Sequence, residues 1–126
     1  SLLTVQTIVK KFCQISGEDA TIVPFLSQGG HGCISVTANI APKMCSDLHN
    51  AWQKGNFKKV QYLNNVLFPL HNALFLETSP GPVKYAASLL KICSSELRLP
   101  LVNIRPDTKK EIKSVLKSLR IKPIKK

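Results

Sequence analysis

A glycine-rich turn followed by a short apolar run, within residues 29–42, constrains the fold most strongly. The three glycines of residues 29–32 permit positive φ angles or the close approach of another chain segment. Residues 33–36 (Cys-Ile-Ser-Val) are small and mostly apolar, which is typical of a parallel strand covered on both faces. Polar residues 37–39 leave this strand, and Pro42 suits the first turn of a helix. The stretch therefore predicts a turn, a buried parallel strand and a helix.

Glycines in such number also occur in phosphate-binding loops. Those loops place their glycines after a strand and at the start of a helix. Here the glycines precede the predicted strand, so we interpret them as a structural turn.

A second strand is predicted upstream of the first. Apolar residues at helical spacing predict a helix over residues 1–9, and the run 12–15 is typical of a strand. A short helix is predicted over residues 22–26. A longer helix is predicted over residues 42–54 and ends before Gly55. The order helix, strand, helix, strand, helix is the βα repeat of a parallel sheet.

From Asn56 onward the pattern predicts helices alone. Apolar residues recur every three or four positions, which predicts one long amphipathic helix that is kinked before Pro69. The Thr-Ser-Pro-Gly-Pro run of residues 78–82 breaks this helix. Further helices are predicted over residues 83–93 and 108–119.

Two adjacent carboxylates follow the first predicted strand. A capping role for Glu18 or Asp19 is favoured over general acid–base chemistry. If Asp19 caps the helix over residues 22–26, Pro24 is awkwardly placed. If Thr21 caps it instead, Pro24 is the third helical residue, whose N–H has no intrahelical partner to lose.

Five segments along the chain are similar to one family. The pattern Gly-Gly-x-Gly-x-Ile-Ser-Val-x-x-Asn-x-x-Pro resembles the signature around the last barrel strand of the dihydrodipicolinate synthase family. The Ile-Ser-Val-x-x-Asn form favours this branch over the related sugar-acid lyases. The other similar segments are residues 16–20 (Ser-Gly-Glu-Asp-Ala), 69–75 (Pro-Leu-His-Asn-Ala-Leu-Phe), 82–84 (Pro-Val-Lys) and 97–100 (Leu-Arg-Leu-Pro).

The resemblance implies an α/β fold that is part of a TIM (β/α)8 barrel. A complete barrel needs about 250 residues, and this chain has 126. Residues 1–55 would be the last two βα units of the barrel, and residues 56–126 a small all-helical C-terminal domain. The expected partners are the N-terminal half of the barrel and, in the complete protein, further subunits of a homotetramer. Whether the chain is a fragment, a separately encoded half or a decayed remnant stays open.

The four cysteines are too widely spaced for a zinc site or a disulfide scaffold. We expect Cys13, Cys33, Cys45 and Cys93 to be buried, reduced thiols of a cytoplasmic protein. There is no apolar run near 18 residues, so no membrane span is predicted. Neither a cofactor nor a bound metal is expected.

Much of the formal net charge of +11 lies in the last predicted helix and the tail that follows. No aromatic residue is interleaved there for base stacking, so nucleic-acid binding is not favoured. The pattern predicts a solvated helix face. The histidines His31, His49 and His71 have no metal-ligand spacing and are predicted to be surface or packing residues.

Catalytic groups of a TIM barrel lie at the carboxyl ends of its strands. By resemblance, Ile34 lines the pyruvate pocket, and Gly17 lies beside it with its backbone close to a Schiff base. An isoleucine side chain can form an apolar contact with the methyl group of pyruvate, and a glycine lets the main chain approach a ligand closely. This interpretation requires that the two strands are parallel and that Ile34 does not lie on an outer surface.

The reaction implied by the family joins pyruvate to aspartate semialdehyde. A partly desolvated lysine forms an imine with pyruvate, the derived enamine attacks the aldehyde, and the adduct cyclises. The family's Schiff-base lysine precedes the region that this sequence resembles, so no catalytic residue is assigned here. Lys84 lies in a predicted helix of the appended part and is not a replacement. The chain alone is therefore expected to be inactive.

Two other functions are compatible with the sequence. One is a sugar-acid aldolase of the same wider family, which substrate exchange in an assay distinguishes. The other is a degenerate, non-enzymatic basic module that binds an acidic partner, whose binding weakens steeply with salt.

Overall fold

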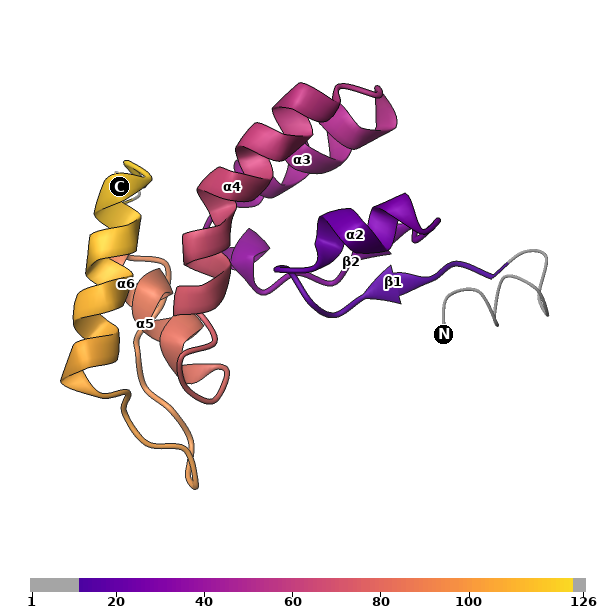
Figure 1. Ribbon diagram of the computed structural model, residues 1–126. Coiled ribbons are helices and arrows are strands. Elements are labelled where there is room, and N and C mark those ends of the chain that lie inside the picture. The colour runs from indigo at the N-terminus through magenta and orange to yellow at the C-terminus, as the bar shows by residue number, and fades with distance from the viewer. Residues whose placement is uncertain (1–11, 124–126) are drawn as a thin grey trace. The chain divides into compact units, whose positions relative to one another are not determined.

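The computed structural model describes residues 12–123, so the predicted helix over residues 1–9 lies outside the described residues. The chain divides into two compact units, residues 1–35 and 36–126, which are described separately below. Figure 1 shows the order of the elements: β1 (Ile15–Ser16), α2 (Ile22–Ser27), β2 (Gly32–Cys33), the 3-10 turn η1 (Thr37–Asn39), α3 (Pro42–Gln53), α4 (Phe57–Ala73), α5 (Gly81–Leu89) and α6 (Pro106–Ser118).

The first unit contains a parallel pair of strands, as the βα repeat predicts. Ile15 of β1 lies opposite Gly32 of β2. The amide of Ile34 donates a 2.8 Å hydrogen bond to the carbonyl of Ser16. Each strand is only two residues long, so the predicted runs 12–15 and 33–36 are wrong in length and position. A strand stays regular only where a neighbouring strand forms hydrogen bonds with it. In the described residues each strand has a single neighbour, which leaves the paired segment short.

Helix α2 connects the two strands and follows Thr21, the second of the two predicted caps. Pro24 is accordingly its third residue. The predicted capping by an acidic side chain is wrong, because the Glu18 carboxylate accepts a hydrogen bond from the amide of Ala20, before the helix begins. Asp19 contributes its backbone carbonyl, which accepts from the amide of Ile22.

The glycine turn before β2 is structural in this unit. Gly29 has a φ of +90°, which favours glycine. A Cβ atom on Gly30 would lie 2.2 Å from the ring of Phe25, so a larger residue does not fit. Both constraints come from the packing of the chain itself.

In the second unit, α3 and α4 lie side by side (Figure 1). Helix α3 begins at Pro42 and is followed by Gly55, whose φ is +67°, as the sequence predicts. Its residues Leu48 and Ala51 are buried. The Asn56 side chain caps α4 by accepting a 3.1 Å hydrogen bond from the amide of Lys59.

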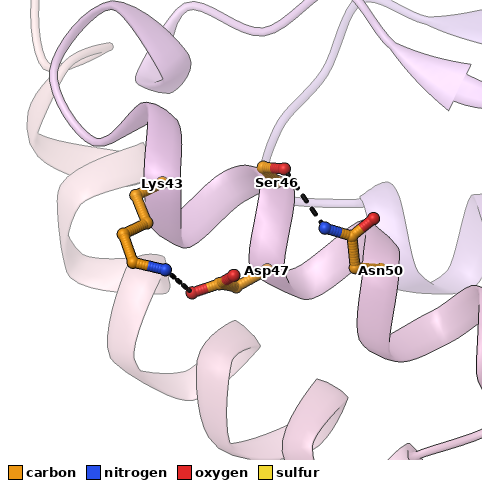
Figure 2. Close-up of polar contacts among 4 residues, drawn as sticks. All are labelled: Lys43, Ser46, Asp47 and Asn50. Atoms are coloured by element: carbon orange, nitrogen blue, oxygen red, sulfur yellow. Dashed lines mark hydrogen bonds and ion pairs between the residues drawn. The ribbon is translucent and has the colours of Figure 1, made fainter.

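The polar face of α3 has two side-chain pairs at i, i+4 spacing (Figure 2). Lys43 Nζ donates to Asp47 Oδ2 at 3.0 Å, and this hydrogen bond lowers the pKa of Asp47. Asn50 Nδ2 donates to Ser46 Oγ at 3.4 Å. The pairs are exposed, and such exposed pairs contribute little to stability. This face is an ordinary solvated surface.

Helix α4 supplies much of the buried apolar surface of the second unit. Leu67, Leu70 and the following Leu74 are at most 1% exposed. Pro69 lies inside this helix, and the ribbon in Figure 1 bends along its length. A proline within a helix removes one backbone hydrogen bond, which is a sufficient cause for the bend.

Helices α5 and α6 pack against each other, and α6 also packs against α4. Helix α6 begins two residues before the predicted start because Pro106 fits its first turn. Ile112, Val115 and Leu116 are buried, whereas Lys110, Lys113 and Lys117 are exposed. The prediction of a solvated basic face is confirmed for this helix.

None of the four cysteines, all within residues 12–123, forms a disulfide, as predicted, but their predicted burial is wrong. Cys13 and Cys93 are exposed, and the other two are intermediate. Both exposed thiols lie in irregular segments outside the helices and strands. Within residues 12–123, no helix has the length and apolar character needed to cross a membrane.

Glu77 links the segment after α4 to the start of α6. Its Oε1 accepts a 3.0 Å hydrogen bond from the amide of Arg105. A side-chain hydrogen bond from Thr108 is the main cause that lowers the pKa of Glu77, and the Arg105 amide adds to it. The carboxylate therefore satisfies donors at the N-terminus of a helix, where negative charge is favourable.

This lowered pKa predicts a pH dependence of stability. The ionised Glu77 stabilises the fold fully above its ordinary pKa of 4.5, and the contribution is lost as pH falls through the lower folded value. In Glu77→Gln, we expect lower stability at neutral pH and a weaker loss of stability on acidification. Urea unfolding between about pH 3 and pH 7 measures both. Glu111→Gln, an exposed position on α6, is the control; equal changes in the two variants would contradict the assignment.

Candidate functional site

The carboxyl ends of β1 and β2 lie at the same edge because the strands are parallel. Gly17 follows β1, and Ile34 follows β2. The hydrogen bond from the Ile34 amide to Ser16 brings the two predicted site residues into one neighbourhood. The Ile34 side chain is 74% exposed and therefore does not belong to the apolar core of this chain.

Gly17 has open space on its side-chain side. Apart from its two neighbours in the chain, a Cβ atom built there would have no atom of the described residues within 4 Å. Unlike Gly30, this glycine is not required by local packing. A requirement for glycine at this position would have to come from a ligand or from another segment of polypeptide.

A buried carboxylate connects the segments that follow the two strands. Asp19 is 3% exposed and accepts a 2.5 Å hydrogen bond from Ser35 Oγ. The Cys33 thiol also lies 3.9 Å from the same carboxylate. Sequence reasoning missed this role and favoured helix capping. The available signal was that an aspartate after one parallel strand and a serine after the next must meet at the same edge.

A second buried polar pair lies at the start of the second unit. Thr37 Oγ1 and His71 Nδ1 are 2.7 Å apart and share a hydrogen bond, and both residues are at most 2% exposed. His71 is thus a packing residue, as predicted. His31 Nδ1 accepts a 3.1 Å hydrogen bond from the amide of Gln14, which is also a structural role.

The remaining candidates from the sequence have structural roles or none. The Lys84 ammonium group donates to the backbone carbonyl of Glu96, which ties α5 to the loop that follows it. In the part of the chain that the structure describes, no three His, Cys, Asp or Glu side chains form a possible metal site. The strand ends are therefore the best candidate for chemistry.

Comparison with known proteins identifies the relatives of this arrangement. The sequence profile of the Dihydrodipicolinate synthetase family matches residues 2–119. The chain belongs to this family. A 4-hydroxy-tetrahydrodipicolinate synthase from Rhodospirillum centenum is 53% identical over 105 residues, covering 83% of this chain and 36% of the relative. A homologue from Gluconobacter oxydans with the same name is 45% identical over 92% of this chain and 39% of its own length.

Solved structures of the family agree in fold. Dihydrodipicolinate synthase from Aquifex aeolicus superposes with a TM-score of 0.91 at 33% identity, covering 99% of this chain and 42% of that protein. The structural neighbours are TIM-barrel enzymes, so this chain has an α/β fold that corresponds to a part of such a barrel protein. It spans less than half the length of the relatives it matches.

The Asp19–Ser35 hydrogen bond is expected to hold the two strand ends together. In Ser35→Ala, a buried carboxylate loses a donor, which costs about 1 to 3 kcal/mol. We therefore expect faster hydrogen–deuterium exchange at the Ile34 amide, which bonds to β1. Ser27→Ala, whose hydroxyl donates to the Pro24 carbonyl at an exposed site, should leave this exchange unchanged. Unchanged exchange at the Ile34 amide in Ser35→Ala would show that the Asp19–Ser35 hydrogen bond does not hold the strand ends together.

Proposed function

We propose that this chain supplies the carboxyl-terminal portion of a 4-hydroxy-tetrahydrodipicolinate synthase. Residues 1–55 would complete the barrel as its last two βα units, and residues 56–126 would form the appended helical domain. The complete enzyme would condense pyruvate with aspartate semialdehyde through a Schiff base, in the diaminopimelate route of lysine biosynthesis. We propose a cytoplasmic location and a homotetramer for that enzyme.

One observation supports this proposal above the others. Gly17 and Ile34 follow neighbouring parallel strands and lie at the carboxyl-terminal edge, where TIM-barrel enzymes have their active sites. This common edge, together with the family membership, supports a shared pyruvate pocket. Ile34 would contact the methyl group of pyruvate, and the Gly17 backbone would lie beside the imine.

The exposure of Ile34 has two possible origins. An isoleucine on the outer surface of the complete protein would be exposed, and this would argue against a pocket role. A side chain directed toward the barrel interior is also exposed when only two of eight strands are present. We favour the second origin because Gly17, beside the same strand ends, has open space where no packing of the chain calls for a glycine.

The reacting amine would come from the N-terminal half of the barrel. A lysine there would form the imine, and the apolar wall at Ile34 would help to keep that amine neutral by excluding water. Asp19 would act as a positioning residue by fixing the loop that contains Gly17 to Ser35, the residue that follows Ile34. The present chain would then contribute pocket shape and no reacting atom.

Reconstitution tests the proposal directly. The chain alone should not turn over pyruvate with aspartate semialdehyde. A mixture with a separately produced N-terminal half that carries the lysine should show activity, and borohydride should trap pyruvate on that half. A well-folded mixture without turnover would contradict the assignment. Cleavage of a sugar acid to pyruvate and an aldehyde, without turnover of aspartate semialdehyde, would indicate the other branch of the family.

Truncation of Ile34 tests its place in the pocket. In the reconstituted enzyme, Ile34→Ala should raise KM for pyruvate about tenfold, because an apolar contact with a small substrate is lost. Ile92→Ala removes the same atoms from a side chain that is 49% exposed and not at a strand end. Equal KM values in both variants would place Ile34 outside the pocket, whatever the activity of the mixture.

A further inference from the structure

A hollow of about 400 Å³ lies between the C-terminal ends of α5 and α6. Its size is within the range of about 300 to 1,000 Å³ that is usual for small-molecule sites. The floor is apolar and consists of Leu89, Leu90, Leu116, Ile121 and Pro123. The rim is cationic and consists of Lys113, Lys117, Arg120 and Lys122.

The end of α6 shapes both the floor and the rim. The Ile121 amide donates to the Leu116 carbonyl at 3.1 Å, and the Arg120 amide donates to the Lys117 carbonyl at 3.0 Å. This is the Schellman pattern, in which the chain turns back over the last helical turn. The turn places Ile121 against the apolar floor beside Leu116. Arg120 occupies the position with positive φ, at +55°, where glycine is the usual residue.

The rim charges have no acidic neighbour that neutralises them in the described part of the chain. The ion pairs found there join Lys43 to Asp47 and Arg105 to Glu77, and neither involves the rim. Lys113 and Lys117 are four residues apart and share one face of α6, and Arg120 follows in the turn after this helix. Like charges at this spacing repel one another, and a bound anion relieves the repulsion.

We propose that this hollow binds a single-chain amphiphile with an anionic head group, such as a fatty acid. The apolar chain would occupy the floor, and the carboxylate would lie among the rim cations. The lysine stems would add apolar surface while their ammonium groups stay at the rim. The helix dipole places roughly half a negative charge at the C-terminal end of α6, which repels an anion. The four positive charges of the rim outweigh this repulsion.

The same observations disfavour the other occupants of a basic surface. A helix that lies on a membrane exposes its bulky apolar residues beside its cations. On α6 the large apolar residues Ile112 and Leu116 are buried. No aromatic side chain lines the hollow, so base stacking with a nucleic acid is absent. This inference does not depend on the proposed condensation.

Calorimetric titration of the full chain tests the site with three probes that share a twelve-carbon chain. We expect dodecanoate, kept below its micelle concentration, to bind once per chain and to weaken as salt is added. Dodecyl maltoside and dodecyltrimethylammonium should bind at least tenfold more weakly. Equal affinity for the neutral probe, or binding without saturation at one per chain, would overturn the proposal. Tighter binding to phosphatidylglycerol vesicles than to dodecanoate would also overturn it, in favour of a membrane surface.

A matched pair of glycine variants separates binding from folding. Arg120→Gly removes a rim charge and also relieves a positive φ, so its stability should not fall. Dodecanoate affinity should nevertheless drop about fivefold. Lys91→Gly is the control, because Lys91 has a φ of 61° in the equivalent turn after α5 and does not line the hollow. An unchanged affinity in Arg120→Gly, or an equal loss in Lys91→Gly, would contradict the proposal.

A charge-reversal pair gives an independent test. Lys113→Glu combined with Lys117→Glu should abolish dodecanoate binding and improve binding of dodecyltrimethylammonium. Lys110→Glu, an exposed lysine of the same helix outside the hollow, should change neither affinity more than twofold. Circular dichroism checks the helix content of each variant. Loss of both amphiphiles with intact helices would contradict an electrostatic site.

Discussion

The parallel pairing of β1 and β2 is the constraint on which the candidate site depends. Parallel strands are ordinarily buried on both faces, and their hydrogen bonds continue into further strands. Here the ladder is two residues long on each side, and Ile15 and Ile34 are more than half exposed. The buried Asp19 carboxylate compensates by joining the segments beyond the strands through Ser35. The geometry of the strand ends therefore relies on a polar contact and few backbone bonds.

Much of the fold could be predicted from local signals. Pro42 and Gly55 mark the ends of α3, and the apolar periodicity from Asn56 marks α4, because start signals, stop signals and helical spacing act over a few residues. The strand lengths could not be predicted, since they depend on neighbours that a local pattern does not contain. The division into a barrel part and a helical part at residue 55 stays a prediction.

The candidate site was predictable in part. Resemblance to the family pointed to Gly17 and Ile34, and the parallel register places both after strands at one edge. The two buried polar pairs were not predicted, because Asp19 and Ser35 are 16 residues apart and Thr37 and His71 are 34 apart. Local rules instead assigned the aspartate to a nearby helix. The predicted parallel pairing of the two strands was the signal that could have related this aspartate to the serine beyond the next strand.

The short ladder has a consequence for assembly. Within residues 12–123 each strand has one hydrogen-bonded neighbour, so the opposite edge of each is where a further strand of a barrel would add. If the N-terminal half of a barrel is a separate chain, completion of the sheet becomes a second-order process whose rate depends on the concentrations of both halves. The strand ends would then reach their final arrangement only on association, so the abundance of one half would limit how much of the other becomes ordered.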